Sequence, residues 1–162
     1  MAGSWLTLRR LAIALPVIFT LHAAEEAPRF VSWFNAHVEP DINERLFWSV
    51  NATGFVITLV VAAIVAAAPR ERAAAMTAVA WVGFLMLANG IFHVAAAIVD
   101  GAYAPGVVTA LLLYLPVSAL IIAAAAREQA MSAMTVAAVA LIGGIPMYVH
   151  GWLIVVEGGR LF

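Results

Sequence analysis

The sequence predicts an all-α integral membrane protein, a bundle of five transmembrane helices. The connection between the first two helices is predicted to be an amphipathic segment that lies at the membrane interface. Composition is the first observation: of 162 residues, 65% are hydrophobic and only 10% are charged. An average soluble domain is roughly 45–50% apolar and about 25% charged. Mean hydropathy is +1.04. The second observation is five long apolar stretches, since a helix needs about 20 residues to cross a hydrocarbon core.

The five stretches make up a single transmembrane domain over residues 1–162. They are rich in Ala, Leu and Val and are separated by short segments that carry charges, prolines or glycines. The four connections are short enough that we expect consecutive helices to be antiparallel neighbours. The predicted spans cover about residues 6–26, 46–68, 73–99, 105–126 and 130–156.

The long connection, residues 28–45, predicts an amphipathic helix at the membrane interface. Phe30, Trp33 and Phe34 recur at positions i, i+3 and i+4, which places them on one face of a helix. Such a segment lies in the interface plane with its apolar face buried. We expect it to cover the same end of the bundle as the polar residues described below.

Arginine sets the expected orientation, because the chain has no lysine. An N-terminus on the cytoplasmic side leaves five arginines on inner flanks and three on outer flanks. We therefore expect a multi-pass protein of a bacterial inner membrane with its C-terminus outside. Residues 9–24 also have features of a cleavable signal peptide. We favour a retained first span, because the acidic pair that follows has a better explanation.

Composition also excludes several classes of function. The chain has no cysteine, so it has no disulfide, thiolate metal site or cysteine nucleophile. Its net charge is −1 and no basic run is present, so we expect no nucleic-acid partner. We expect membrane lipids and a lipid-like or small amphiphilic substrate as partners. The Ala-rich faces also permit association between protomers.

Three histidines lie inside predicted spans, where ionisable groups are costly and usually functional. His22, His93 and His150 each precede a charged residue by seven positions, about 10 Å along a helix. Because their helices run in the same direction, the three imidazoles are expected at one depth. The charged residues that end these intervals, Asp100 and Glu157 among them, are expected to mark the membrane boundary.

Polar neighbours accompany two of these histidines on their helices. Glu25 and Glu26 flank the direction of His22, about 60° to one side and about 40° to the other. Asn89 lies about 40° from His93, one turn away. Imidazoles and carboxylates at one depth predict a nitrogen/oxygen metal site, with His22, Glu26, His93 and His150 as ligands. The structural alternative is hydrogen bonding between helices.

The motif His22-Ala-Ala-Glu25-Glu26 resembles that of the HXXEE family of small integral membrane proteins. The Asn89–His93 pair, the segment from Tyr103 to Ala110, and His150 look like later blocks of that family. The resemblance covers nearly the whole chain. It implies a membrane-embedded, metal-dependent enzyme of uncharacterised reaction and supplies no substrate.

The expected function is a zinc-dependent hydrolase acting on an amphiphile from the outer leaflet. One of Glu25 and Glu26 would be a ligand and the other the general base for a metal-bound water. Asn89 would orient a ligand or stabilise an oxyanion. A di-iron oxidase or oxygenase is the second hypothesis, although such bundles typically use four carboxylates and two histidines. A non-enzymatic subunit that handles metal or protons, or serves assembly, is the third.

Overall fold

The computed structural model describes residues 6–37 and 42–152, and this part of the chain is helical without any strand. The helices are α1 (Leu8–Glu26), α2 (Phe30–His37), α3 (Glu44–Ala67), α4 (Arg72–Val82), α5 (Asn89–Asp100), α6 (Val107–Thr109), α7 (Leu115–Glu128) and α8 (Ala133–Trp152). Two π-helical segments, η1 (Gly83–Ala88) and η2 (Ala110–Tyr114), join α4 to α5 and α6 to α7.

Within residues 6–37 and 42–152, four continuous helical stretches are long and apolar enough to cross a membrane. They are Glu44–Ala67, Arg72–Asp100, Val107–Glu128 and Ala133–Trp152. A fifth candidate is the pair formed by α1 and α2, which passes the same test together but bends by 63° at the break between them. The all-helical fold class is therefore confirmed, with four helices suited to a membrane, or five if the bent pair is one span.

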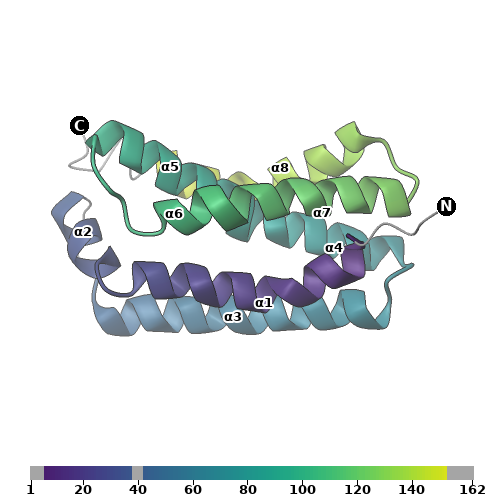
Figure 1. Cartoon of the computed structure of the whole chain (residues 1–162), viewed down its shortest axis with the longest axis horizontal. Coiled ribbons are helices and arrows are strands. Elements are labelled where there is room, and N and C mark those ends of the chain that lie inside the picture. The colour runs from purple at the N-terminus through teal and green to yellow at the C-terminus, as the bar shows by residue number, and fades with distance from the viewer. Residues whose placement is uncertain (1–5, 38–41, 153–162) are drawn as a thin grey trace.

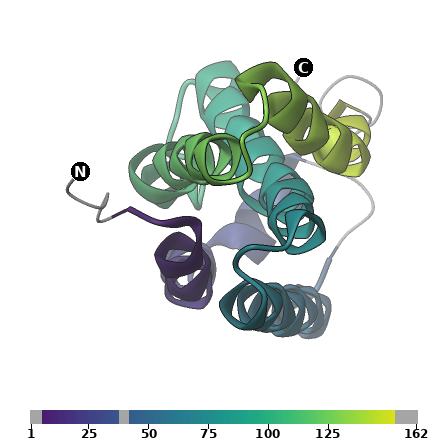
Figure 2. The same cartoon turned by 90° about the vertical axis from the view of Figure 1, so that its right-hand side faces the viewer.

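The long helices run nearly parallel or antiparallel along one axis (Figure 1). α1 packs along α3, and α8 packs along α4 and η1. Figure 2 looks along the bundle from the end where α1 begins and shows α4 among the surrounding helices. α2 lies at the opposite end and turns away from the line of α1, beside the end of α5 (Figure 1). α2 thus occupies the segment predicted to be interfacial.

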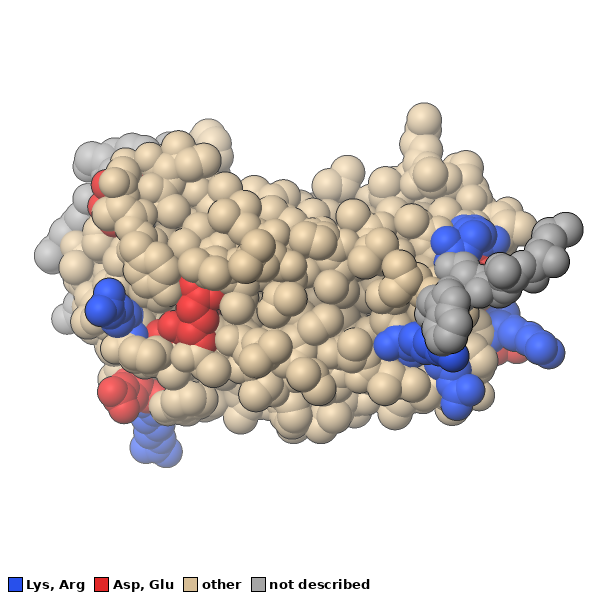
Figure 3. Space-filling model, viewed as in Figure 1, with Lys and Arg blue, Asp and Glu red and all other residues tan. Residues whose placement is uncertain are grey.

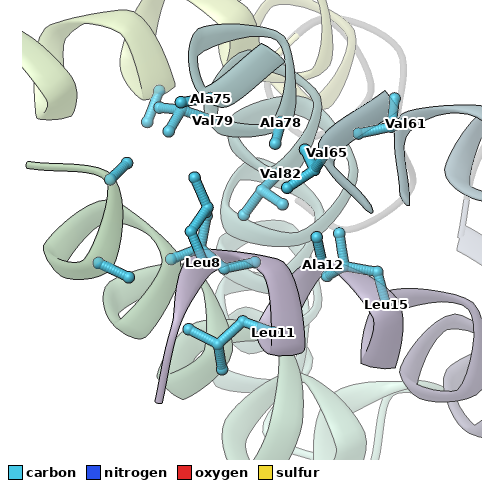
Figure 4. Close-up of a cluster of buried hydrophobic side chains, with 14 of the residues drawn as sticks. Leu8, Leu11, Ala12, Leu15, Val61, Val65, Ala75, Ala78, Val79 and Val82 are labelled. Atoms are coloured by element: carbon cyan, nitrogen blue, oxygen red, sulfur yellow. The ribbon is translucent and has the colours of Figure 1, made fainter. Parts of the chain in front are cut away.

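The largest apolar cluster of the described residues fills the half of the bundle where α1 begins and extends through Met86 of η1 and Tyr114 of η2 toward the other half. Leu8, Leu15, Val65 and Val79 are fully buried within it. Figure 4 shows these side chains converging from α1, α3 and α4. Gly83, the first residue of η1, lets α8 approach closely, because a Cβ atom there would lie 2.0 Å from the Ala140 carbonyl oxygen. This half contains the tight apolar packing, so the polar residues of the other half are not needed to form it.

Charged side chains are concentrated at the two ends of the molecule. Figure 3 shows arginines at both ends, an uncharged band between them, and one acidic patch set inward from the left end. At the right end, the Glu128 carboxylate accepts a 2.9 Å hydrogen bond from the Leu8 backbone N–H and so caps α1. An uncharged waist between charged ends is the pattern expected of a chain that spans a bilayer.

Candidate metal centre

His22, Glu26 and His93 form one buried group between α1 and α5. One ligand atom from each of the three lies within 4.8 Å of the others. Glu26 Oε1 is 3.6 Å from His22 Nε2 and 3.1 Å from His93 Nε2. Only 2% of His22, 6% of Glu26 and 1% of His93 is exposed. Glu26 follows His22 by four residues, about one turn of α1, so both side chains project from the same face of that helix.

His93 is the member of the group with unsatisfied polar atoms. Both of its ring nitrogens are buried and lack a hydrogen-bond partner among the described residues. The 3.1 Å approach of Nε2 to Glu26 meets the distance for an ion pair but lacks the geometry of a hydrogen bond. Buried polar groups are nearly always paired. A nitrogen and an oxygen that approach each other without sharing a proton therefore fit two ligands directed at a common cation.

Glu25 faces away from this group, toward the start of α6. Its carboxylate accepts hydrogen bonds from the Tyr103 hydroxyl (2.9 Å), the Val108 N–H (3.0 Å), and the Thr109 N–H (2.7 Å) and hydroxyl (2.5 Å). It thus satisfies the free N–H groups at the N-terminus of α6. Burial, together with the bond to Glu25, raises the pKa of Tyr103 and keeps its phenol in the donor form. The two glutamates therefore contact different parts of the structure: Glu26 faces the two histidines, and Glu25 faces Tyr103 and the start of α6.

Thr109 connects Glu25 to His22. Its hydroxyl has one hydrogen, which it donates to Glu25, so toward His22 Nδ1 it acts as an acceptor across 2.7 Å. His22 must then have its proton on Nδ1, which leaves the lone pair on Nε2. That nitrogen is the one nearest Glu26. An outer carboxylate and hydroxyl that fix the tautomer of a histidine are typical of metal-ligating histidines.

Aromatic rings and a glycine enclose the two imidazoles. The Tyr114 ring stacks on His22 with a centroid distance of 4.0 Å, and its buried hydroxyl has no partner among the described residues. Phe30 of α2 lies 6.2 Å from His93, so α2 covers the outer end of the site. Gly106 has a φ of +91°, and a Cβ there would lie 2.8 Å from His93 Cε1 and 2.9 Å from His22 Cε1. The loop before α6 therefore fits against both rings only with glycine at this position.

Asn89 lies beside the group but contacts one member weakly. Its side-chain nitrogen is 3.4 Å from His22 Nε2, a long contact in which the amide faces the lone pair. The residue begins α5 directly after η1. π-Helical segments often occur at functional sites, because the inserted residue redirects the side chains that follow. Asn89 and His93 both lie on α5, and the preceding π-helical segment η1 changes the direction in which the side chains of α5 point.

His150 lies apart from the group that the sequence predicted it would join. α8 packs through Val136, Ala140 and Gly144, whereas His150 is exposed. At about 100° per residue, position 150 lies roughly 120° from Gly144 around the helix axis. Equal depth along parallel helices therefore does not bring the third imidazole inward. The structure groups two of the predicted histidines with Glu26 and leaves His150 on another face.

The boundary acids also have other neighbours. Asp100 accepts from the indole of Trp33 at 3.4 Å and lies 3.2 Å from His37 Nε2, so it holds α2 against the end of α5. Glu157 lies outside the described residues. Asp100 therefore belongs to the packing of α2 and not to the His–Glu group.

Comparison with sequence families adds one finding. The profile described as "Protein of unknown function with HXXEE motif" matches residues 13–121, which include His22, both glutamates, Asn89 and His93. The match covers more than half of the chain. The chain belongs to the HXXEE family. Searches among curated proteins and among solved structures gave no match.

The HXXEE motif now has a structural description in this chain. Its histidine and second glutamate face the buried group, and its first glutamate faces the loop before α6. Three other contributors carried no assigned role in the sequence: Gly106, Thr109 and Tyr103. A signal for them was present, because a Pro-Gly turn followed by a helix start offers free N–H groups that a carboxylate can cap.

Proposed function

We propose that this HXXEE protein is a membrane-embedded, metal-dependent hydrolase with a single zinc ion as its cofactor. The observation that carries the proposal is the buried convergence of His22, Glu26 and His93, in which His93 lacks any protein hydrogen-bond partner among the described residues. Such a donor set, two imidazoles and one carboxylate, matches known hydrolytic zinc sites. Iron is the alternative metal.

The number of ligands supports a catalytic site over a structural one. Catalytic zinc has three protein ligands and keeps a fourth position for water or substrate, whereas structural zinc is closed by four. Three residues converge here. The same count supports one metal over a di-iron centre, because Glu25 directs its oxygens to Tyr103, Val108 and Thr109.

Each residue then has a defined task. His22, His93 and Glu26 would hold the ion, and bound zinc would supply a water with a pKa near 7 and a Lewis acid for a carbonyl or phosphoryl oxygen. Thr109 holds His22 in the tautomer that presents Nε2. Asn89 has an amide N–H beside the site that is suited to a developing negative charge. Glu25 positions Thr109 and is not placed to act as the base.

The position of the group supports an amphiphilic substrate. His93 lies in a helical stretch apolar enough to cross a membrane, and His22 lies in the bent α1–α2 pair that passes the same test, near the end that α2 covers. Substrate would reach this depth with an apolar tail in the bilayer and a polar group at the site. Under the positive-inside orientation, that end faces the outer leaflet of a bacterial inner membrane.

Elemental analysis of purified protein tests the metal. We expect one zinc per chain in the wild type and less than a tenth of that in His93→Ala. His150→Ala is the matched control, since it removes a histidine of similar depth outside the group, and it should retain the metal. No metal in the wild type, or equal loss in both variants, would overturn the proposed site. Two irons per chain would favour the di-iron alternative.

A separate assay tests hydrolysis. Purified protein in detergent would be given ester, amide and phosphoester amphiphiles, with and without a chelator. We expect turnover of at least one class that chelation abolishes and added zinc restores. A fully loaded protein that cleaves none of the three classes would contradict the hydrolase assignment while leaving the metal site intact.

A further inference from the structure

A pocket of about 400 Å³ lies next to the metal centre, at the end of the bundle that α2 covers. It is lined by residues from the α1–α2 junction, α2 and the loop after α5: Arg29, Ser32, Trp33, Ala102, Tyr103 and Pro105. Its volume falls in the range of small-molecule sites, roughly 300–1,000 Å³. The lining combines one cation, two hydroxyl groups, an indole and a proline ring.

Arg29 gives the pocket its charge. It is the charged member of the lining, and no carboxylate of the described residues lies within ion-pair distance of its guanidinium. The nearby acids are engaged elsewhere: Asp100 with Trp33 and His37, and Glu25 with Tyr103 and the start of α6. The Glu26 carboxylate lies in the His–Glu group. A guanidinium offers a planar pair of donors that matches carboxylate and phosphate oxygens.

The pocket and the metal centre share a wall. Tyr103 lines the pocket and donates to Glu25, which also accepts from Thr109, and the Thr109 hydroxyl contacts His22. Pro105 lines the pocket, and the next residue, Gly106, lies against both imidazoles. A molecule held by Arg29 would therefore be separated from His22 and His93 by the short segment that contains Pro105 and Gly106.

We infer that this pocket binds the anionic headgroup of a single-chain or double-chain amphiphile, with a phosphate or carboxylate paired to Arg29. Trp33 and Tyr103 supply the amphipathic walls that suit the boundary between headgroups and acyl chains. The assignment of this amphiphile as the substrate of the metal centre rests on the proposed hydrolase function. Its binding to the pocket does not.

Binding can be measured without any activity. Dodecyl phosphate and dodecanoate would be titrated separately into protein held in dodecyl maltoside micelles, with heat or intrinsic tryptophan fluorescence as the signal. We expect saturable binding of at least one of the two, and at least tenfold weaker binding by Arg29→Gln. Inorganic phosphate is the third arm, and binding as tight as that of dodecyl phosphate would show an ion site that needs no amphiphile.

Arg45→Gln is the matched control. Arg45 is exposed near the start of α3, does not line the pocket, and carries the same charge at the same end of the chain. We expect its binding to stay within twofold of the wild type. Equal weakening by both substitutions would mean that arginines merely attract anions to this end, and it would overturn the pocket. Absence of saturable binding to the wild type would do the same.

Two further variants separate the possible failures. Ala102→Trp keeps every charge but fills the pocket, and it should also weaken binding at least tenfold; this arm holds if Arg29→Gln does not fold. His93→Ala should lose the metal and bind dodecyl phosphate as the wild type does. Loss of binding in His93→Ala would show that the anion sits on the metal rather than on Arg29, which contradicts the inference.

Discussion

His93 Nε2 lies 3.1 Å from Glu26 Oε1, and the two side chains come from helices separated by more than sixty residues of sequence. The pair is buried and lacks hydrogen-bond geometry. Isolated buried charges are costly, and a cation between the carboxylate and the unpaired imidazole would stabilise both.

The two glutamates of the motif should respond differently to the same substitution. Glu26→Gln removes the anionic ligand, so we expect at least a hundredfold loss of zinc affinity with little change in thermal stability. Glu25→Gln weakens four hydrogen bonds to the loop and to α6, which should lower the free energy of unfolding by about 1–3 kcal/mol. Competition with a fluorescent chelator and thermal unfolding in detergent measure the two effects. Identical profiles for both variants would contradict the divided roles.

Thr109→Val should weaken metal binding, although Thr109 is not a proposed metal ligand. The variant has the same shape but no hydroxyl, so His22 Nδ1 loses its acceptor and Glu25 a donor. Loss of such an outer partner typically costs 10–100-fold in affinity. Thr109→Ser should restore most of that loss, which a purely steric role would not explain. Nitrogen NMR of His22 should report the proton on Nδ1 in the wild type and a tautomer mixture in the valine variant.

Gly106→Ala should disrupt the site, whereas Gly101→Ala should not. Both glycines have positive φ, +91° and +64°, so alanine is strained at each by about 1–3 kcal/mol. At Gly101 nothing lies within 4 Å of the added Cβ, but at Gly106 it would contact both imidazoles within 2.9 Å. We expect a lower unfolding midpoint for both and loss of zinc only for Gly106→Ala. Equal zinc retention would show that the loop can move away from the rings.

His150→Ala should leave metal affinity within about twofold of the wild type, because His150 is exposed on α8 and outside the group. His22→Ala should lose zinc under the same conditions. Because both changes remove one histidine, their comparison controls for nonspecific binding of metal to exposed imidazole. Metal loss in His150→Ala would restore the three-histidine site that the sequence alone suggested.

Periodicity and depth predicted more of the fold than of the site. Long apolar runs required helices, and charged breaks marked their ends, so the helical bundle followed from hydropathy alone. The pairing of His22 with His93 followed from depth, because antiparallel neighbours repeat the same level in every second helix. His150 satisfied the same criterion, yet rotation about α8 is set by which small residues pack against α4, and depth carries no information on rotation.

Residues without charge escaped prediction for a different reason. Gly106 and Thr109 matter through a positive φ and a single hydroxyl hydrogen, and both properties depend on contacts between segments far apart in sequence. The π-helical turns before Asn89 and within Ala110–Tyr114 also carry no sequence pattern at a period of 3.6. Positions after such turns are rotated from where a regular helix would place them.

The absence of His22, Glu26 and His93 from the apolar core has a consequence for biogenesis. Small zinc domains that lack a core fold only when the ion arrives. In this chain the packing around Leu8, Leu15, Val65 and Val79 uses none of the three residues of the His–Glu group, so insertion and assembly can finish before any ion binds. We therefore expect a stable apoprotein in the bilayer that acquires its metal late, from the compartment facing α2.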